Sequence, residues 1–259
     1  MSRDSADTDD PPATQPAARD ARPYYQRVLL KISGEAFCKP GHFGIDGDEL
    51  AVIAGEIAAA AKHGAQLAVV VGGGNIIRGA NLAAAGNIPQ STADYMGMLA
   101  TALNALALKE TLEKQGVPAR VLSAINLSAV AETFIRGRAL RHLEKGRVVI
   151  FVAGTGNPFF TTDSAAALRA VEIGADVLLK ATKVDGIYDK DPNQHDDAVR
   201  YDTITFQEAI ARQLKVMDLT AFSMCMERNV PVIVFNMKKP GHIAEVVSGI
   251  HHGTRVVQG

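Results

Sequence analysis

The distribution of apolar residues along the chain predicts alternating strands and helices. Six short runs rich in Val, Ile, Leu and Phe have the length and continuity of strands that are buried on both faces. They cover residues 27–32, 66–71, 117–122, 147–152, 176–181 and 230–235, and residues 253–257 are expected to add a terminal edge strand. Helical patterns separate the runs. This alternation predicts an α/β protein, a single three-layer αβα sandwich with a central, mostly parallel sheet.

The predicted helices differ in what their ends and faces indicate. Asp46 and Glu49 form a capping-box pattern at the start of one helix. A longer helix is expected from a Thr92 cap through Leu112, which places Asp94 in its first turn. There the carboxylate either complements the helix dipole or binds ligand hydroxyls. The apolar stripe of this helix is typical of a core or a subunit interface and consists of Tyr95, Leu99, Leu103 and Leu106. Further helices are expected over residues 134–144, 164–171, 206–214, 218–229 and 242–248.

Four of the predicted strands end in loops that are suited to bind anions. The loop AGTGNPFFTTDSA, residues 153–165, follows a buried strand and opens a helix, where backbone N–H groups and the helix dipole favour negative charge. In open α/β sheets ligands bind at the carboxyl ends of the strands. The four loops contain Lys31 to Gly34, Gly72 to Gly74, Thr155 to Asp163, and Thr182 to Asp191.

Three side chains in these loops each permit two interpretations. Lys31 stands in an apolar run, so it either reaches an anion or extends to water from an edge strand. Arg78 suits an anionic group, but a solitary arginine is more often a solvated surface residue. The dipeptide Asp185-Gly186 predicts a hairpin that leaves Tyr188 either free to stack on a flat ring or simply exposed.

The familiar motifs of other enzyme classes are absent from the sequence. The glycine triplet does not fit the GxGxxG dinucleotide pattern, and no GxxxxGK[ST] sequence occurs. No Ser-His-Asp arrangement, Cys-His arrangement or metal-ligand cluster is suggested. The loops instead supply backbone N–H groups, cations, hydroxyls and two aspartates, which are suited to polyphosphate rather than to acyl transfer.

Composition narrows the choice of partner and compartment. The chain has 259 residues and a formal charge of −1, which gives no electrostatic case for nucleic acid or a membrane surface as its main partner. No apolar run has the length of a membrane helix, and two distant cysteines suit a reducing cytoplasm. Residues 1–22 are rich in Asp, Ala and Pro and are expected to form a disordered leader before a single domain over residues 23–259.

Several of these stretches together resemble one family. From about residue 24 to the C-terminus, the chain is similar to the bacterial uridylate kinases of the amino-acid-kinase superfamily. The resemblance is carried by the sequences KISGE at 31–35, GGGN at 72–75, DYMGMLAT at 94–101, GTGNPFFTTD at 154–163, KATKVDG at 180–186 and VMD at 216–218. The DYMGMLAT and GTGNPFFTTD runs are specific to this branch of the superfamily, whereas the glycine triplet alone would be weak evidence for it.

The resemblance implies transfer of the ATP γ-phosphoryl group to UMP with Mg²⁺. Lys31, Asp163 and Arg78 are the implied catalytic residues. The implied ATP-binding residues are Lys31, Ile32, Ser33, Gly34, Gly74, Arg78, Thr182, Tyr188 and Asp191. The implied UMP-binding residues are Gly73, Asp94, Thr155, Gly156, Asn157, Pro158, Phe159, Phe160, Thr161 and Thr162.

The resemblance also implies a homohexamer that GTP activates and UTP inhibits. The loop that mediates the GTP response corresponds to Lys39, Pro40, Gly41, His42, Phe43 and Gly44, whose His and Pro content leaves the response open. The chemistry is consistent with this family: a phosphate monoester is already anionic, so transfer needs positioning and charge stabilisation rather than a general base. A superfamily kinase for a small carboxylate and a nucleotide sensor without catalysis are the alternatives.

Overall fold

The computed structural model describes residues 23–259 except 79–85, 87, 193 and 215–216. The expected leader over residues 1–22 lies outside the described residues, as does Val216 of the VMD sequence. The nine described strands form one sheet in the order β4-β3-β5-β2-β1-β6-β8-β9-β7. Their bounds are β1 Arg27–Ile32, β2 Gln66–Val71, β3 Ala119–Ser123, β4 Glu132–Thr133, β5 Val148–Val152, β6 Val177–Thr182, β7 Thr203–Thr205, β8 Val232–Asn236 and β9 Thr254–Val257.

The sheet is mixed but mostly parallel, as predicted. All neighbouring strands pair in parallel apart from β8 and β9, which are antiparallel. The six predicted internal strands are confirmed, with ends shifted by no more than two residues. The prediction of an edge strand at 253–257 is wrong in its position, because β9 lies between β8 and β7. The true edges are the short strands β4 and β7, which lack a long apolar run.

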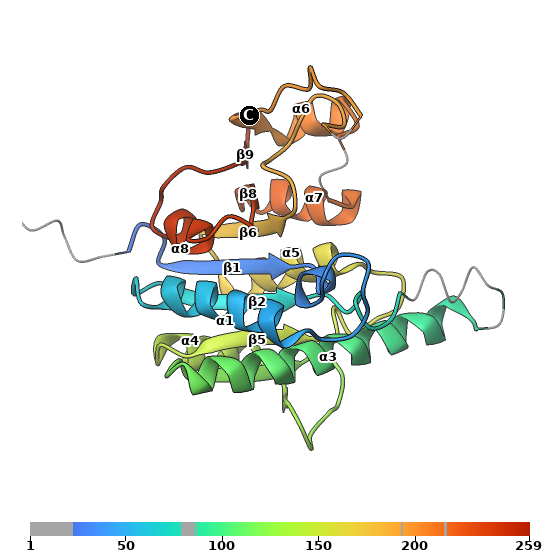
Figure 1. The fold of residues 1–259 in the computed structure, drawn as a ribbon, viewed down its shortest axis with the longest axis vertical. Coiled ribbons are helices and arrows are strands. Elements are labelled where there is room, and N and C mark those ends of the chain that lie inside the picture. Colours follow the sequence, from blue (N-terminus) through green and yellow to red (C-terminus); the bar gives the residue numbers. More distant parts are fainter. Residues whose placement is uncertain (1–22, 79–85, 87, 193, 215–216) are drawn as a thin grey trace, which may run out of the picture.

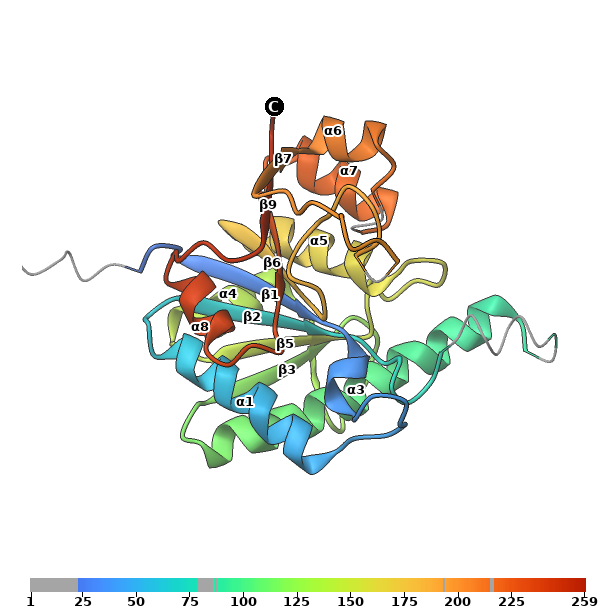
Figure 2. The same cartoon turned by 45° about the horizontal axis from the view of Figure 1, so that its top comes forward.

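Helices cover both faces of the sheet, which gives the expected three layers (Figures 1 and 2). The helices are α1 Gly47–Ala61, α3 Gln90–Lys114, α4 Arg136–Glu144, α5 Thr162–Ile173, α6 Phe206–Ala211, α7 Leu219–Glu227 and α8 His242–Val247, with a 3-10 helix η1 at Gly34–Phe37. Strand β1 shows why both faces are apolar. Leu30 and Ile32 pack with α1, α3 and α8, whereas Leu29 packs with α5 and α7, and all three are fully buried.

The long helix α3 starts earlier than predicted. Pro89 is its N-cap and Gln90 its first residue, so Thr92 lies inside the helix and Asp94 lies beyond the first turn. The interpretation of Asp94 as a partner of the helix dipole is therefore wrong. The apolar stripe is not core within this chain, because Tyr95, Leu99 and Leu103 are 43%, 48% and 51% exposed.

No hairpin forms at Asp185-Gly186, which corrects a further prediction. The Thr182 hydroxyl donates to the Val184 carbonyl and accepts from the Val184 N–H, so the chain turns as soon as β6 ends. Tyr188 instead forms an isolated antiparallel bridge with Arg200. Within the described part of the chain, none of the helices has both the length and the apolar character needed to cross a membrane.

Candidate active site

Four adjacent strands bring the predicted ligand loops together. The order β5-β2-β1-β6 is continuous and all its pairs are parallel, so the carboxyl ends of these strands lie at one edge of the sheet (Figure 2). The strands lie next to one another although β5 is more than a hundred residues from β1 in sequence. The prediction that the four loops converge is therefore confirmed.

At this edge Asp163 lies between two lysines. The Asp163 carboxylate, in the first turn of α5, accepts a hydrogen bond from Lys180 Nζ at 2.6 Å and lies 2.8 Å from Lys31 Nζ. Lys31 and Lys180 are register partners on β1 and β6, and all three side chains are only 12–14% exposed. Because β1 is a central strand, Lys31 does not extend to water from an edge, and that interpretation is wrong. Lys180 was not among the predicted site residues.

Burial and charge act in opposite directions on this group. Burial raises the pKa of the Asp163 carboxyl, but the charges of Lys31 and Lys180 outweigh it and hold that pKa below its ordinary value. Burial lowers the pKa of Lys180, Asp163 opposes this effect, and the neighbouring Lys31 charge adds to it. One carboxylate thus lies between two ammonium groups, and this excess of positive charge is suited to an anionic ligand.

The glycines of the first two loops serve chain packing as well as ligand access. A Cβ at Gly34 would lie 2.6 Å from the Gly74 nitrogen, and a Cβ at Gly72 would lie 2.7 Å from the Gly34 nitrogen. A Cβ at Gly73 would lie 2.8 Å from the Ala100 side chain on α3. Real Cβ atoms do not approach so closely, so these positions require glycine because backbone packs on backbone. Gly74 is different, since its nearest such neighbour is Arg78 at 4.0 Å.

Two buried asparagines that the sequence analysis did not identify fix the glycine loop. Asn75 and Asn104 exchange side-chain hydrogen bonds of 3.0 and 2.7 Å, and Asn104 also donates to the Gly72 carbonyl at 2.8 Å. Asn75 donates to the Gly44 carbonyl at 2.7 Å. Both side chains are at most 1% exposed. This pair connects the glycine loop to α3 on one side and to the loop 39–44 on the other.

The loop before α5 is held at two points. Ala153, at a φ of 62°, donates its N–H to Thr101 Oγ1 on α3 at 2.8 Å. Phe159, at a φ of 71°, donates its N–H to Asp94 Oδ2 at 2.8 Å. Positive φ is uncommon for residues other than glycine and often marks a functional loop. Asp94 thus anchors this loop in the unliganded chain.

The start of α5 is fixed by its cap and by Asp218. Thr161 is the N-cap, and its hydroxyl accepts from the N–H groups of Asp163 and Ser164. The Asp218 carboxylate accepts from the hydroxyls of Thr161 and Ser164, the latter at 2.9 Å, and also caps α7. This network fixes the turn of helix that carries Asp163.

A cavity of about 490 Å³ collects most of the predicted UMP-binding residues. Its lining includes Gly73, Asp94, Thr155, Phe159, Phe160, Thr161 and Thr162, together with Gly74 and Arg78. Phe159 and Phe160 are 75% and 52% exposed. Exposed aromatic side chains that line a cavity often mark a ligand-binding surface. Gly156, Asn157 and Pro158 belong to the same loop but are not part of the lining.

Two of the predicted ATP-binding residues, Gly74 and Arg78, line this same cavity, and several of the others line two further cavities. One, of about 560 Å³, is lined by Thr182, Tyr188 and Asp191. A smaller one, of about 290 Å³, is lined by Lys31, Ser33, Lys180 and again Thr182. Gly34 is buried, as described above, and the Ile32 side chain is fully buried in the core, so only the Ile32 backbone is available to a ligand.

A second carboxylate with two cations lies beside the lysine pair. Glu35 pairs with Arg78 and accepts a hydrogen bond from Lys183 Nζ at 2.9 Å. The hydrogen bond from Lys183 makes the largest contribution to lowering the pKa of Glu35, and the Arg78 charge lowers it further. Glu35 and Lys183 line the same small cavity as Lys31 and Lys180. Arg78 is therefore held at the site by an ion pair.

The predicted regulatory loop lies next to this group. The residues Lys39, Pro40, Gly41, His42 and Phe43 line a pocket of about 230 Å³ together with Glu35, Arg78 and Lys183. Phe43 is 82% exposed. The Gly44 N–H donates to the Asn75 carbonyl at 2.8 Å, so the loop is bonded directly to the glycine loop of the site.

Comparison with known proteins gives consistent matches. The sequence model of the Amino acid kinase family matches residues 26–236. A protein of Xanthomonas campestris pv. campestris named Uridylate kinase is 57% identical over 235 residues, which are 91% of this chain and 97% of that protein. The structure of UMP kinase from Bacillus anthracis matches with a TM-score of 0.88 at 37% identity, covering 91% of this chain and 97% of that one. The structure of UMP kinase from Ureaplasma parvum matches with a TM-score of 0.85 at 39% identity, covering 90% of this chain and 99% of that one.

Proposed function

Because the chain belongs to the amino acid kinase family, we propose that it is a nucleoside monophosphate kinase of pyrimidine nucleotide biosynthesis that transfers the γ-phosphoryl group of ATP to UMP. The products are UDP and ADP. The observation that carries the proposal is the Lys31–Asp163–Lys180 group beside these cavities. Lys31 and Lys180 line the 290 Å³ cavity with Thr182, which also lines the 560 Å³ cavity, and Asp163 directly follows Thr162 of the 490 Å³ cavity. Two largely buried cations held by one carboxylate suit phosphoryl transfer.

The cavities suggest where each nucleotide binds. The 490 Å³ cavity, with its exposed Phe159 and Phe160 and its threonines, suits UMP, because aromatic faces can cover a base and hydroxyls can bind phosphate. The 560 Å³ cavity with Tyr188 and Asp191 suits the adenosine part of ATP. The ATP phosphates then lie over Lys31, Ser33 and Lys180 in the smaller cavity between.

The chain's cations perform the catalytic work in this mechanism. The UMP phosphate is the nucleophile and is already ionised, so no side chain needs to remove a proton. Lys31 and Lys180 stabilise the charge that spreads over the equatorial oxygens of the transferring group, and Asp163 holds both ammonium groups in place. Arg78, held by Glu35, lines the acceptor cavity and stabilises the same charge from the other side.

Mg²⁺ enters this mechanism as part of the substrate MgATP, in which it neutralises phosphate charge. The carboxylates next to the lysine pair favour this arrangement. Asp163 lies within ion-pair distance of two ammonium groups, and Asp218 accepts hydrogen bonds from two hydroxyls, so the protein already engages both carboxylates.

Regulation and assembly have separate support. We propose that GTP activates and UTP inhibits the enzyme, with the GTP response passing through the loop 39–44, because that loop is bonded to the glycine loop through Asn75. The exposed apolar stripe Tyr95, Leu99 and Leu103 of α3 supports assembly into a homohexamer. Two buried, unpaired cysteines support a cytoplasmic location. Residues 23–259 would then form one kinase domain.

The test is ADP release from MgATP with UMP, CMP, dUMP, aspartate and glutamate offered in parallel, with and without GTP. Turnover confined to UMP, with at most weak use of dUMP, is the expected result. Turnover with aspartate or glutamate would assign the acceptor cavity to a carboxylate. Binding of ATP without turnover of any acceptor would favour a sensor.

A further inference from the structure

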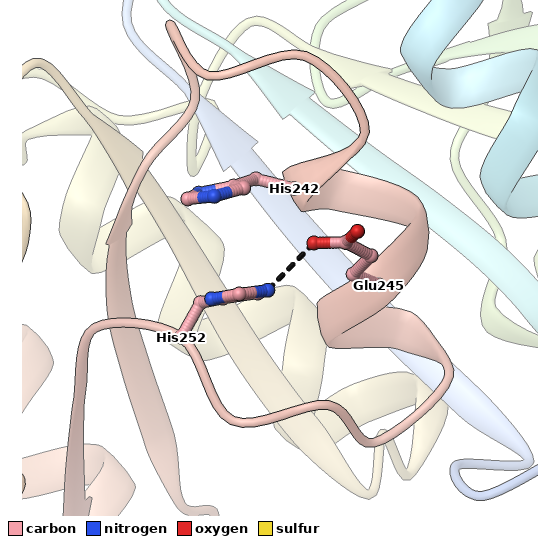
Figure 3. Close-up of side chains that lie close together, drawn as sticks. All are labelled: His242, Glu245 and His252. Atoms are coloured by element: carbon pink, nitrogen blue, oxygen red, sulfur yellow. Dashed lines mark hydrogen bonds and ion pairs between the residues drawn. The ribbon is translucent and has the colours of Figure 1, made fainter.

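Three side chains of the kinds that bind metal ions lie close together outside the lining of the nucleotide cavities, between α8 and the start of β9. His242 and Glu245 come from α8, one turn apart, and His252 comes from the segment that leads into β9 (Figure 3). One potential ligand atom from each of the three lies within 4.8 Å of the others. The two imidazole rings are stacked, with centroids 4.1 Å apart and planes 9° from parallel. The ten-residue separation of the histidines gave no metal-site pattern in the sequence.

We propose that His242, Glu245 and His252 form a binding site for a divalent transition-metal ion such as Zn²⁺. Two imidazoles and one carboxylate are the donors that such an ion takes, and Mg²⁺ prefers oxygen ligands and water. Zinc bonds to nitrogen and oxygen are about 2.1 Å long, so tetrahedral ligand atoms lie about 3.4 Å apart. The three atoms lie within 4.8 Å of one another and the two rings are stacked, so metal binding requires the partly exposed His252 and Glu245 side chains to rotate toward His242.

The hydrogen bonds of His242 already prepare it as a ligand. Its Nδ1 lies 3.1 Å from the Asn236 carbonyl, which can only accept, so Nδ1 carries the proton. The lone pair is therefore on Nε2. Metal-bound histidines generally donate their second ring N–H to a carbonyl or carboxylate in this way, which fixes both the tautomer and the ring direction. Asn236 ends β8, so this bond also fixes the ring to the sheet.

Glu245 and His252 need one proton shift to bind the ion. In the metal-free chain His252 Nε2 donates to Glu245 Oε2 at 2.6 Å. On metal binding the neutral ring moves its proton from Nε2 to Nδ1, and both Nε2 and the carboxylate oxygen then face the ion. The His252 and Glu245 side chains are 28% and 44% exposed, so the ion has access from solvent and keeps water in its remaining position.

The site would cross-link two consecutive elements of the C-terminal part of the chain. The ion would connect α8 to the start of β9, next to the antiparallel pairing of β9 with β8. The Asn236 side chain donates to Asp185 in the loop after β6 at 3.2 Å. Metal binding is therefore expected to stabilise the C-terminal segment without adding a ligand to either nucleotide cavity.

The test is calorimetric titration of the chelator-treated full chain with Zn²⁺, with millimolar Mg²⁺ present throughout. We expect one ion per chain. Each of three variants should weaken Zn²⁺ binding: His242→Ala, Glu245→Gln and His252→Ala. Loss of a residue that only orients a metal ligand typically costs about 10–100-fold in affinity, so loss of a ligand should cost at least as much. His251→Ala is the matched control, since His251 is the exposed neighbour outside the cluster, and it should bind as the wild type does.

Three further measurements keep the result unambiguous. Circular dichroism checks that each variant folds, and a Co²⁺ titration reports nitrogen and oxygen ligation through its visible absorption, which the His252→Ala variant should lose. Zn²⁺ should raise the Tm of the wild type and of His251→Ala, and it should leave the Tm of the three ligand variants unchanged. Absence of Zn²⁺ binding, or equal weakening by His251→Ala and His252→Ala, would overturn the proposal and leave an ordinary His–Glu ion pair.

Discussion

Replacing Lys180 by methionine separates catalysis from stability at the centre of the site. Lys180 is largely buried, and both burial and the Lys31 charge lower its pKa, so its ammonium is costly in the unliganded protein. Two like charges about 6 Å apart repel by about 3 kcal/mol at an effective dielectric constant of 20. The substitution removes this repulsion and the desolvation of one ammonium. It loses an attraction to Asp163 of about 6 kcal/mol at their 2.6 Å separation on the same scale, while the desolvation penalty of one buried ion is several kcal/mol. The terms nearly cancel.

We therefore expect Lys180→Met to leave the free energy of unfolding within about 1 kcal/mol of the wild type. Asp163 keeps Lys31 as its partner at 2.8 Å, so no carboxylate is left without a counter-charge. The activity should respond differently. Loss of one preorganised cation from the transferring phosphoryl group costs on the order of 10²–10³ in kcat. KM for UMP should change little, because Lys180 does not line the acceptor cavity.

Asp163→Asn is the contrasting variant. It leaves two largely buried ammonium groups without a carboxylate, and removing one partner of a buried ion pair costs about 3–5 kcal/mol. Urea unfolding and steady-state ADP release measure the two effects in parallel. A Lys180→Met protein with wild-type kcat, or one destabilised as strongly as Asp163→Asn, would refute the assignment of Lys180 to transition-state charge.

Three further predictions address the same site. Lys31→Ala should lower kcat by on the order of 10²–10³, measured by ADP release, and an unchanged kcat would remove Lys31 from the mechanism. Asn104→Ala should cost about 2–3 kcal/mol in urea unfolding, because the buried Asn75 amide loses its partner, while the exposed control Asn126→Ala should be near neutral. The pKa of the Asp163 carboxyl is lower in the folded protein than its value of about 4 in the unfolded chain. Its contribution to stability is therefore complete above about pH 4 and is lost as the pH falls through the folded-state pKa. The difference in unfolding free energy between wild type and Asp163→Asn should accordingly narrow on acidification below about pH 4. A gap that stays constant with pH would contradict the ion pair.

The parts of the fold that follow from the sequence are those with a strong local pattern. Continuous runs such as residues 66–71 are confirmed as strands because both faces are buried. The edge strands β4 and β7 have two and three residues and no apolar run, so pairing with β3 and β9 alone defines them. The predicted start of α3 was wrong because Thr92 is a residue type that often caps helices, whereas the N-cap in the structure is Pro89, which has no capping side chain.

The lysine pair was present in the sequence as a repeated pattern. Residues 28–31 and 177–180 both read VLLK, and β1 and β6 pair in register, so Lys31 and Lys180 must lie side by side. The pattern is visible once the strands are known to be neighbours. The pairing of Asn75 with Asn104 had no comparable signal, since an asparagine inside a helical pattern does not indicate its partner.

The charges of the site have a common arrangement that argues for an anionic ligand. Asp163 holds Lys31 and Lys180, and Glu35 holds Arg78 and Lys183, so each carboxylate lies between two cations. Both carboxylates have lowered pKa values and stay ionised at neutral pH. Each group therefore keeps one positive charge in excess, although the whole chain has a formal charge of −1. Members of both groups line one cavity of about 290 Å³. Two excess charges facing one small cavity are stable only if solvent or an anion balances them, and a polyphosphate bound there satisfies both groups at once.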